Sequence, residues 1–172
     1  MIHWDRCGRS GYVGVFGRYE ITVLRSYVTG LLELIEHRAA SYVPVAAGAD
    51  RVVRVPTSAT EDLRLLAILK DEVGADEPDW VLAISEAPCL LRAHGLLDLV
   101  WATIPEADCV VHLQSRDGAD AWLQCIRYFL VSIAGVADAE GMVKGMDTIP
   151  TITWLSEVSE SLRLAVERTV MA

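Results

Sequence analysis

The stretch from Arg18 to Arg38 constrains what this chain can fold into more than any other part of its sequence. Apolar residues recur along it at intervals of three and four, which is the spacing of one face of an α-helix. These residues are Ile21, Leu24, Val28, Leu31 and Ile35. Because an apolar face of this kind must be covered, the stretch predicts a long helix packed against other elements.

A second helix is predicted from a capping signal. Ser58 precedes Glu61 by three residues, which is the arrangement of a capping box, where two side chains accept backbone N–H groups at a helix start. Helically spaced apolar residues follow, namely Leu63, Leu66, Leu69 and Val73. The helix is then expected to end near Gly74.

A third long helix is predicted to begin at a proline. Pro88 suits a first turn, where its missing N–H has no partner to lose, and Pro105 stops the helix. The segment from Trp80 to Glu86 is expected to be a separate, shorter helix. One face of the long helix consists of Leu90, His94, Leu97, Trp101 and Ile104. His94 therefore lies on an apolar stripe, where a boundary histidine is expected and a catalytic one is the alternative.

Short strands are predicted near the N-terminus and in the middle of the chain. Ile2 to Trp4 and Tyr12 to Phe16 flank a glycine-rich turn and predict a hairpin. Cys109 to Gln114 alternates like a strand, and Val52 to Val55 is a candidate edge strand. A tight hairpin explains the glycines better than a phosphate-binding loop does, because the Lys and Ser/Thr of a P-loop are missing. These glycines are Gly8, Gly11, Gly14 and Gly17.

Arg127 is the one charged residue between Ala121 and Ala134. It lies in a predicted helix whose N-cap is Ser115 and whose last residue is expected to be Gly135. Because an α-helix turns by about 100° per residue, Arg127 falls on one narrow stripe of the helix surface together with other, mostly polar residues. The stripe comprises Asp117, Asp120, Gln124, Arg127 and Val131. We therefore expect its methylenes to pack on the core and its guanidinium to reach solvent or an acid. A binding role at the helix surface is the alternative.

A last amphipathic helix is predicted to begin at Thr151, with an apolar face of Leu155, Val158, Leu162, Val166 and Val170. These elements together predict a mainly α fold with a little strand (α+β), a helical bundle of about four to six helices with a few short N-terminal and mid-chain strands. A chain of 172 residues can form one domain with its own core, so we expect a single domain over 1–172. Flexible segments are expected near 41–57, 71–79 and 136–148.

Charge and composition exclude several functions. A net charge of −9 repels nucleic-acid phosphates, so no nucleic-acid partner is expected. No uncharged run approaches the roughly 20 residues that span a membrane. Charges at Asp5 and Arg6 replace the apolar core of a signal peptide, so a cytoplasmic location is expected. The acidic segment from Asp71 to Asp79 lacks the spacing of a calcium loop and is expected to be an exposed linker.

Metal and cofactor chemistry has no motif in this sequence. The four cysteines form no C-x-x-C pair and are expected to be reduced, small apolar residues. They are Cys7, Cys89, Cys109 and Cys125. No histidine lies within a helical turn of His94 to make a metal pair. We therefore expect no metal, no cofactor and no catalytic residues.

Six blocks spread over nearly the whole chain indicate a family. They read MIHWDR, YEITVLRSYVTGLLELI, EDLRLLAIL, LLRAHGLLDLVWATIPE, VVHLQSRDGADAWLQCI and ITWLSEVSESLRLAV. In their order and spacing the chain resembles the actinobacterial domain of unknown function 2017 family, which implies a shared, mainly helical fold. Family members carry an Asn-Asp-x-Arg run after an Ala-Trp pair, where this chain has Arg127, Tyr128 and Leu130. Family genes lie beside that of the Clp protease adaptor for N-terminal residues, which implies a role near regulated proteolysis.

Two classes of function remain open. The first is a non-enzymatic protein-interaction or regulatory module, because apolar helix surface is abundant and no catalytic constellation is present. It predicts a protein partner or a homodimer with an interface of at least about 1,000 Å². The alternative is a small-molecule-binding protein or enzyme with a pocket between helices, where His94, Arg127 and Tyr128 are the first candidates for ligand binding.

Overall fold

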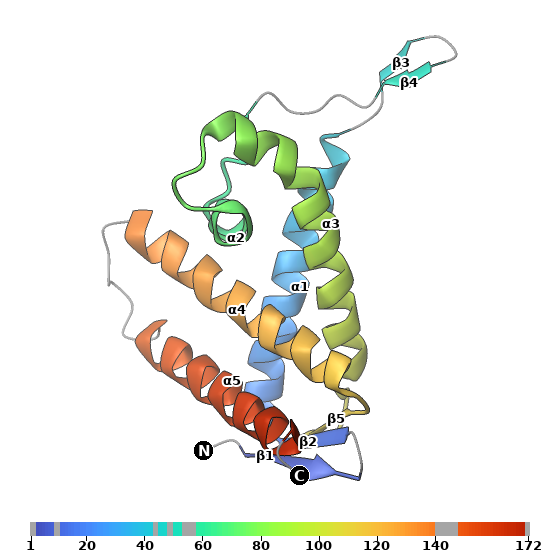
Figure 1. Cartoon of the computed structure of the whole chain (residues 1–172), viewed down its shortest axis with the longest axis vertical. Helices are drawn as coiled ribbons and strands as arrows, with labels where there is room; N and C mark the ends of the chain where they lie inside the picture. Colours follow the sequence, from blue (N-terminus) through green and yellow to red (C-terminus); the bar gives the residue numbers. More distant parts are fainter. Residues whose placement is uncertain are drawn as a thin grey trace.

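The computed structural model describes residues 3–8, 11–42, 45–47, 50–52, 58–139 and 148–170. The elements in this part of the chain are β1 (Trp4–Cys7), β2 (Gly11–Val15), α1 (Arg18–Ala40), β3 (Val45–Ala47), β4 (Asp50–Val52), α2 (Leu63–Val73), α3 (Asp79–Thr103), β5 (Val110–Leu113), α4 (Arg116–Ala139) and α5 (Thr148–Val170). Helices dominate, and the sheet of β1, β2 and β5 lies at one end of the bundle (Figure 1). The predicted mainly α, α+β fold is confirmed.

The predicted N-terminal hairpin is confirmed, and the first strand, predicted at Ile2–Trp4, is described as β1 (Trp4–Cys7), while Ile2 lies outside the described residues. Strand β2 pairs antiparallel with both β1 and β5, in the order β1-β2-β5. Glycines make the hairpin possible. Gly8 has a φ of +67°, and a Cβ at Gly14 would come within 2.8 Å of the Trp4 ring.

Helix α1 begins and ends close to the predicted bounds, and the five residues predicted for its apolar face are the five that it buries. The helix starts after Gly17, whose backbone N–H donates to Glu20 Oε2 at 2.5 Å. A Glu at the third helical position thus satisfies a donor that the helix itself leaves without a partner. The first turn of α1 is therefore fixed by its own sequence.

The predicted Ser58–Glu61 capping box is wrong, because Asp62 caps α2. Asp62 Oδ1 accepts the backbone N–H groups of Arg64 at 2.9 Å and Leu65 at 3.3 Å. A carboxylate directly before the helix reaches these donors without help from a residue four positions earlier. The buried face shifts accordingly to Leu65, Ile68 and Leu69, while the predicted Leu63 is exposed. The helix ends before Gly74 as predicted.

Helix α3 is continuous through Pro88, which corrects the prediction of two helices separated at that residue. A proline inside a helix removes one backbone hydrogen bond and strains the preceding turn. Buried residues stand on both sides of it, namely Leu82, Ala83 and Glu86 before and Cys89, Leu90 and Ala93 after. Burial on both sides of Pro88 offsets the lost bond and keeps the helix continuous.

Helix α4 continues past Gly135, the residue predicted to end it. A Cβ at Gly135 would lie 2.6 Å from Ala67 Cβ and 3.2 Å from the Leu63 carbonyl oxygen on α2. Glycine is therefore needed here for close approach of two helices, and not for a helix end. The cap at the other end is as predicted, since the backbone N–H of Gly118 donates to Ser115 Oγ at 3.2 Å.

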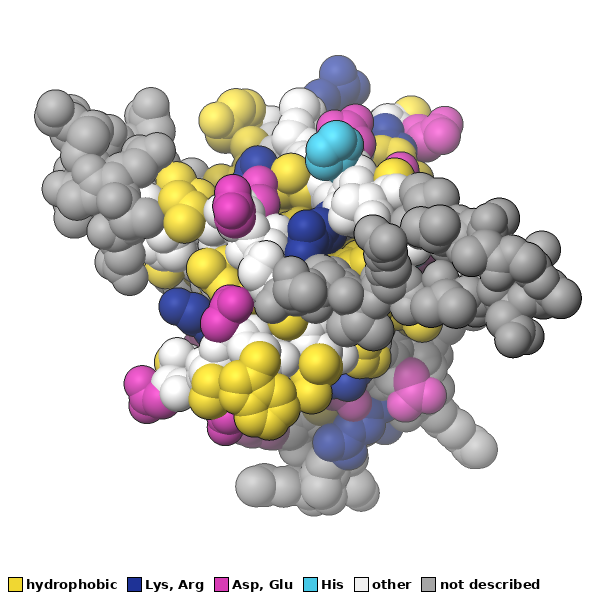
Figure 2. All heavy atoms as spheres, turned by 90° about the horizontal axis from the view of Figure 1, so that it is seen from above, with side chains coloured by type: hydrophobic (Ala, Val, Ile, Leu, Met, Phe, Trp, Pro, Cys, Tyr) yellow, Lys and Arg dark blue, Asp and Glu magenta, His cyan; other side chains and the backbone are white. Residues whose placement is uncertain are grey.

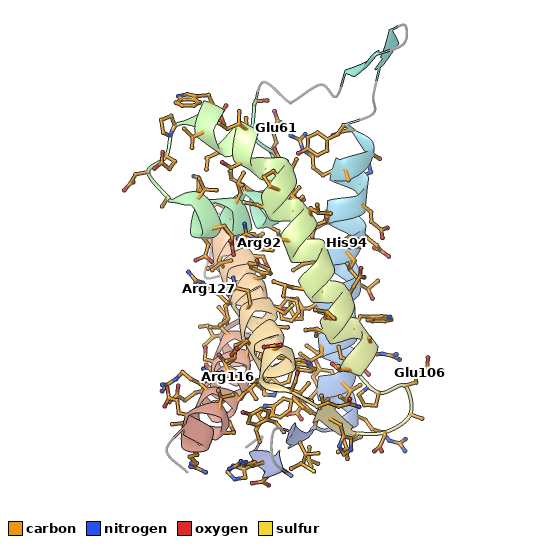
Figure 3. All side chains as sticks on the ribbon, turned by 45° about the vertical axis from the view of Figure 1, so that its right-hand side comes forward. Glu61, Arg92, His94, Glu106, Arg116 and Arg127 are labelled. Carbon is orange, nitrogen blue, oxygen red and sulfur yellow. The ribbon has the colours of Figure 1, made fainter. Side chains whose placement is uncertain are left out.

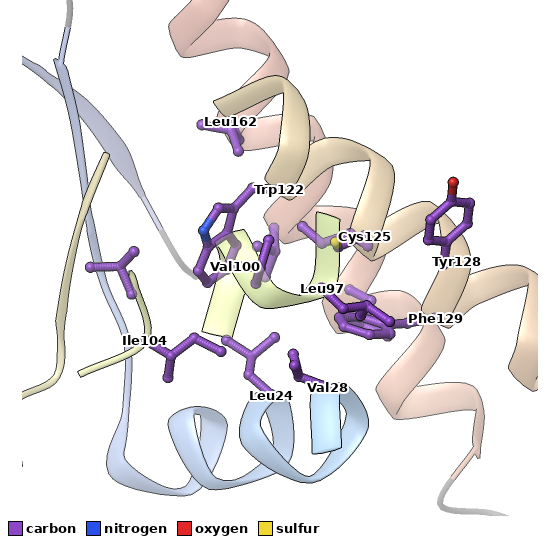
Figure 4. Packing of buried hydrophobic residues seen from close by; sticks show 14 of the residues in the cluster. Leu24, Val28, Leu97, Val100, Ile104, Trp122, Cys125, Tyr128, Phe129 and Leu162 are labelled. Atoms are coloured by element: carbon purple, nitrogen blue, oxygen red, sulfur yellow. The ribbon is translucent and has the colours of Figure 1, made fainter. Parts of the chain in front are cut away.

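The main core lies between α1, α3, α4 and α5 (Figure 4), and it includes Leu65 and Ile68 of α2 and residues of the sheet. Trp4 packs edge-on against Phe16 and Trp122, with ring centroids 5.6 and 5.5 Å apart. Trp122 Nε1 donates to Thr103 Oγ1 at 2.8 Å, which satisfies its buried N–H. Trp80 and Trp101 are exposed, so Trp101 is not buried with the leucines of the face predicted for its helix.

The three segments expected to be flexible contain regular structure where they are described. Strands β3 and β4 pair antiparallel within 41–57, and Val52 ends β4, while Val53 to Val55 of the predicted edge strand lie outside the described residues. Residues 71–73 belong to α2, and 136–139 belong to α4. The linker between α2 and α3 is therefore only five residues long, 74–78.

Candidate functional site

Helix α3 presents large apolar side chains to solvent as well as to the core. Its inner face buries eight residues, while Trp80, Ile84, Leu91 and Leu99 are 64%, 57%, 76% and 61% exposed. At about 100° per residue, Trp80, Ile84 and Leu91 fall within about 40° of one another around the helix. We call the side formed by Trp80, Ile84, Leu91 and Leu99 the outer face of α3. A helix on the surface of a protein normally turns its apolar residues to the core and polar residues to solvent, so a second, exposed apolar side is unusual.

The neighbouring helices leave this side of α3 uncovered. Figure 3 looks onto α3, with α1 on one side of it and α4 on the other. Figure 2 looks onto the end where α3 begins and shows hydrophobic side chains among the charged ones. Large apolar side chains that the described chain leaves exposed in a row are candidates for contact with another molecule.

Charged side chains flank the outer face of α3. Arg92 and His94 point to opposite sides of the helix (Figure 3). Arg92 Nη1 donates to Glu72 Oε2 on α2 at 2.7 Å. His94 lies 3.0 Å from Asp98 Oδ2 through Nδ1 and 3.6 Å from Glu36 Oε1 through Nε2. His94 is therefore the boundary histidine that the sequence predicted, half-buried between α1 and α3.

Arg127 reaches an acid, as its position on the polar stripe of α4 predicts. Its Nη2 donates to Asp71 Oδ1 at 2.8 Å, and this hydrogen bond raises the pKa of the guanidinium. Neighbouring Tyr128 has a buried ring and a hydroxyl that points away from the core (Figure 4). That hydroxyl donates to Glu72 Oε1 at 2.9 Å, and burial, with the nearby Glu72 carboxylate, raises the pKa of Tyr128 to about 12.

These contacts correct the prediction that the acidic segment from Asp71 to Asp79 is an exposed linker. Asp71 and Glu72 lie in the last turn of α2 and are mostly buried. The carboxylates of Asp76, Glu77 and Asp79 are exposed. Glu72 accepts hydrogen bonds from Arg92, Gln124 and Tyr128, so it joins α2 to both α3 and α4. The sequence contained a signal for this arrangement, because a helix that ends before Gly74 has Asp71 and Glu72 in its last turn and not in a linker.

The structure thus brings two of the three predicted ligand-binding residues together. Arg127 and Tyr128 both meet carboxylates at the end of α2, whereas His94 lies across α3, beside α1. At neutral pH the Tyr128 hydroxyl is protonated and acts as a donor, and its raised pKa extends this state to higher pH. A shared ligand-binding role for the three residues stays a prediction.

A buried ion pair between Arg38 and Glu86 was missed from the sequence. Glu86 has no exposed surface, and its two carboxylate oxygens accept from Arg38 Nε at 2.6 Å and Nη2 at 3.0 Å. The Tyr42 ring lies against this guanidinium, and burial, with Glu86, raises the pKa of Tyr42 to about 12. The prediction of a helix break at Pro88 hid Glu86, which continues the buried face of α3.

Two cavities lie away from the predicted ligand-binding residues. One, of about 690 Å³, is lined mainly by residues of α1 and α4, among them Tyr27, Leu31 and Ile133, and also by Arg64 of α2 and Thr151 of α5. The other, of about 620 Å³, lies beside β1 and α5, where Trp4 and Leu164 line it. His94, Arg127 and Tyr128 line neither cavity.

The described residues contain no group of three or more His, Cys, Asp or Glu side chains placed to hold a metal ion. All four cysteines are free thiols, as expected. Cys7 is exposed, and Cys125 is buried, which raises the pKa of its thiol to about 12. Within the same described ranges no helix is both long enough and apolar enough to cross a bilayer.

The fold and these surfaces define a mainly helical protein with a small antiparallel sheet, a tightly joined α2 and one helix whose apolar outer face is uncovered. The chain belongs to the domain of unknown function 2017 family, whose model matches residues 1–166. This confirms the family resemblance of the sequence. No curated protein and no solved structure matches the chain.

Proposed function

We propose that this protein is a non-enzymatic, cytoplasmic protein-interaction or regulatory module that binds its partner through the outer face of α3. The observation that supports this proposal is the row of exposed apolar side chains on that helix. Burying apolar surface contributes about 25 cal/mol per Å², and exposed tryptophans such as Trp80 often dominate binding energy. Arg92, His94 and Asp98 supply the polar rim that such interfaces have.

A photo-crosslinking residue at position 91 tests this proposal. We expect benzoylphenylalanine at Leu91 to form a discrete adduct in a lysate of the source organism. The matched control carries the same group at Ile149, an exposed apolar residue on α5, and is expected to form no such adduct. Adding Leu99→Glu to the position-91 variant should abolish the adduct, because it places a charge on the same face. Equal adducts from positions 91 and 149 would contradict the proposal.

The family resemblance points to regulated proteolysis as the process in which this interaction takes part. The first candidate partner is the Clp protease adaptor that recognises N-terminal residues. We expect the purified adaptor to bind the wild-type chain and to lose binding on Leu99→Glu, with Ile149→Glu as the unaffected control. Absence of binding to the wild-type chain would remove the adaptor as partner, and the position-91 adduct would then identify another protein.

A small-molecule-binding function is the second candidate, supported by the cavity between α1 and α4. Its volume of about 690 Å³ falls within the range of roughly 300–1,000 Å³ that ligand pockets occupy. Ala137→Trp places a large side chain in its lining. We expect this variant to lose the fluorescence of a bound naphthalene-sulfonate probe while its near-ultraviolet circular dichroism stays unchanged. Equal probe binding in both proteins would count against a ligand in this cavity.

A further inference from the structure

We infer that the outer face of α3 docks a second copy of this chain, with the two α3 helices antiparallel and crossing at Gly95. This inference rests on the proposed function, because it assigns a partner to the same face. Three observations support it. Gly95 has no contact within the chain that requires a glycine, exposed leucines stand at equal distances before and after it, and opposite charges also stand at equal distances before and after it.

Gly95 lies in the middle of an exposed part of α3, where glycine is the least favourable residue after proline. A Cβ there would meet nothing within 4 Å. At Gly14 and Gly135, by contrast, a Cβ would come within 3 Å of the Trp4 ring or of Ala67 on α2. Those glycines are explained by contacts within the chain. Such contacts explain neither Gly95 nor Gly30, and of these two only Gly95 lies on α3, between the exposed Leu91 and Leu99. A glycine on an open apolar face allows another helix to approach the backbone closely.

A twofold axis at Gly95 sets which residues meet. In an antiparallel pair, each residue before Gly95 faces the residue at the same separation after it in the second copy. Leu91 therefore faces Leu99 of the second copy, and this contact occurs twice. Leu91 and Leu99 are two of the most exposed apolar residues among those described. The pairing would bury both at the centre of the contact.

The same axis pairs opposite charges. Arg92 and Asp98 stand three residues before and after Gly95, so Arg92 faces Asp98 of the second copy on each side. Their side chains are 59% and 57% exposed. Glu72 accepts from Nη1 of Arg92, and a guanidinium has five N–H donors, so Arg92 can hold a second carboxylate. Two residues of the same charge at positions 92 and 98 would oppose self-association, whereas the opposite charges of Arg92 and Asp98 favour it.

The contact of two single helices is small, so the dimer is expected to be reversible. The 25 residues of α3 extend over about 37 Å at 1.5 Å per residue. Such contacts lie at the low end of specific interface sizes. We therefore expect sedimentation equilibrium to show the particle mass rising with concentration from 18.9 kDa toward twice that value. Leu99→Glu should hold the mass at that of one chain, and Ile149→Glu should behave as wild type.

Cysteine substitution tests the position of the axis. A residue on a twofold axis meets its own copy, so Gly95→Cys should form a disulfide-linked dimer under mild oxidation. The experiment uses a Cys7→Ser/Cys109→Ser background, which removes the exposed and half-exposed native thiols. Gly30→Cys is the matched control, since Gly30 is also a helix-interior glycine with open space at its Cβ. A mixture of Leu91→Cys and Leu99→Cys chains should cross-link far more than either variant alone.

Each outcome decides between this inference and the proposed function. A wild-type chain that stays at 18.9 kDa at every concentration, or equal cross-linking at positions 95 and 30, would overturn docking of a second copy. If the position-91 adduct then contains a different protein, the interaction function stands with another partner. If the chain is monomeric and position 91 gives no adduct beyond the control, both fail.

Discussion

Glu86 is the one acidic or basic residue that is fully buried among the described residues. A carboxylate without water is costly unless its oxygens accept strong hydrogen bonds. Arg38 meets this need with two hydrogen bonds from one planar guanidinium, the geometry that favours arginine over lysine. The pair links the end of α1 to the first half of α3.

Glu86→Gln tests the strength of this link. The amide keeps the shape but loses the charge, which leaves the Arg38 guanidinium without its counter-ion, and Arg38 is itself partly exposed. We expect the free energy of unfolding in urea to fall by about 2–3 kcal/mol, somewhat below the cost of breaking a fully buried pair. The control is Glu160→Gln, in an exposed pair with Arg163, which should leave the urea midpoint nearly unchanged. Equal effects of the two substitutions would contradict the assignment.

Tyr128→Phe is expected to change how stability depends on pH. Removal of the hydroxyl costs about 1 kcal/mol at pH 8, because the hydrogen bond to Glu72 is lost. Burial raises the pKa of Tyr128 from 10.0 in the unfolded chain to about 12 in the folded one. Its contribution is therefore complete below pH 10 and is lost as pH rises from 10 to 12, because only the unfolded state releases the proton there. Urea unfolding should show that the difference in free energy of unfolding between the wild type and Tyr128→Phe falls between pH 8 and pH 11. A difference that stays constant over this range would contradict the raised pKa.

At the scale of elements, the fold is held by close contacts at glycine as well as by apolar faces. The outcome of a Gly→Ala substitution depends on what the new methyl group meets. At Gly30 it meets open space, and at Gly135 it meets Ala67 on α2. Two substitutions with the same effect on helix propensity should thus have opposite effects on stability.

Gly30→Ala is expected to raise the free energy of unfolding by about 0.5–1 kcal/mol, which is the helix-propensity difference between the two residues. Gly135→Ala is expected to lower it by about 1–3 kcal/mol, because α2 must move away from α4. Urea unfolding of both variants measures the difference. Stabilisation by both substitutions would mean that α2 and α4 do not pack as closely as described.

The sequence predicted elements best where one local signal was sufficient. The apolar period fixed α1 and its buried face, and glycines with the strand pattern fixed the hairpin. The errors at Pro88 and Gly135 share a cause, since each residue usually ends or starts a helix by its local preference. In this chain burial on both sides of Pro88, and the contact of Gly135 with α2, override that preference. Such contacts join residues far apart in sequence, so no local pattern indicates them.

At the scale of the whole molecule, the site was less predictable than the fold. Arg127 was correctly expected to reach solvent or an acid, but the sequence could not name the acid, because Asp71 is 56 residues away in the chain. The sequence placed Leu90 and Leu97 on the packed face of α3 and Leu91 and Leu99 off it, but it did not indicate that the other helices leave their side of α3 open. That side depends on where α1, α2 and α4 all pack.

The net charge of −9 gives a last prediction about self-association of the whole molecule. In a dimer the centres of two such copies lie roughly 40 Å apart, which is twice the radius expected for a compact chain of 172 residues, and their net charges repel each other. With a Debye length of about 30 Å at 0.01 M salt this repulsion is about 2 kcal/mol, and at about 8 Å in 0.15 M salt it is negligible. The two Arg92–Asp98 pairs are exposed and contribute about 0–1 kcal/mol each, and salt removes only part of this because paired charges lie closer together than the Debye length of about 8 Å.

We therefore expect dimerisation to strengthen roughly tenfold or more from 0.01 M to 0.15 M salt, since about 1.4 kcal/mol corresponds to a factor of ten. Sedimentation equilibrium at both salt concentrations measures the change. A dimer that weakens with added salt would be held mainly by charge pairs, and would contradict an interface whose centre is the contact of Leu91 with Leu99.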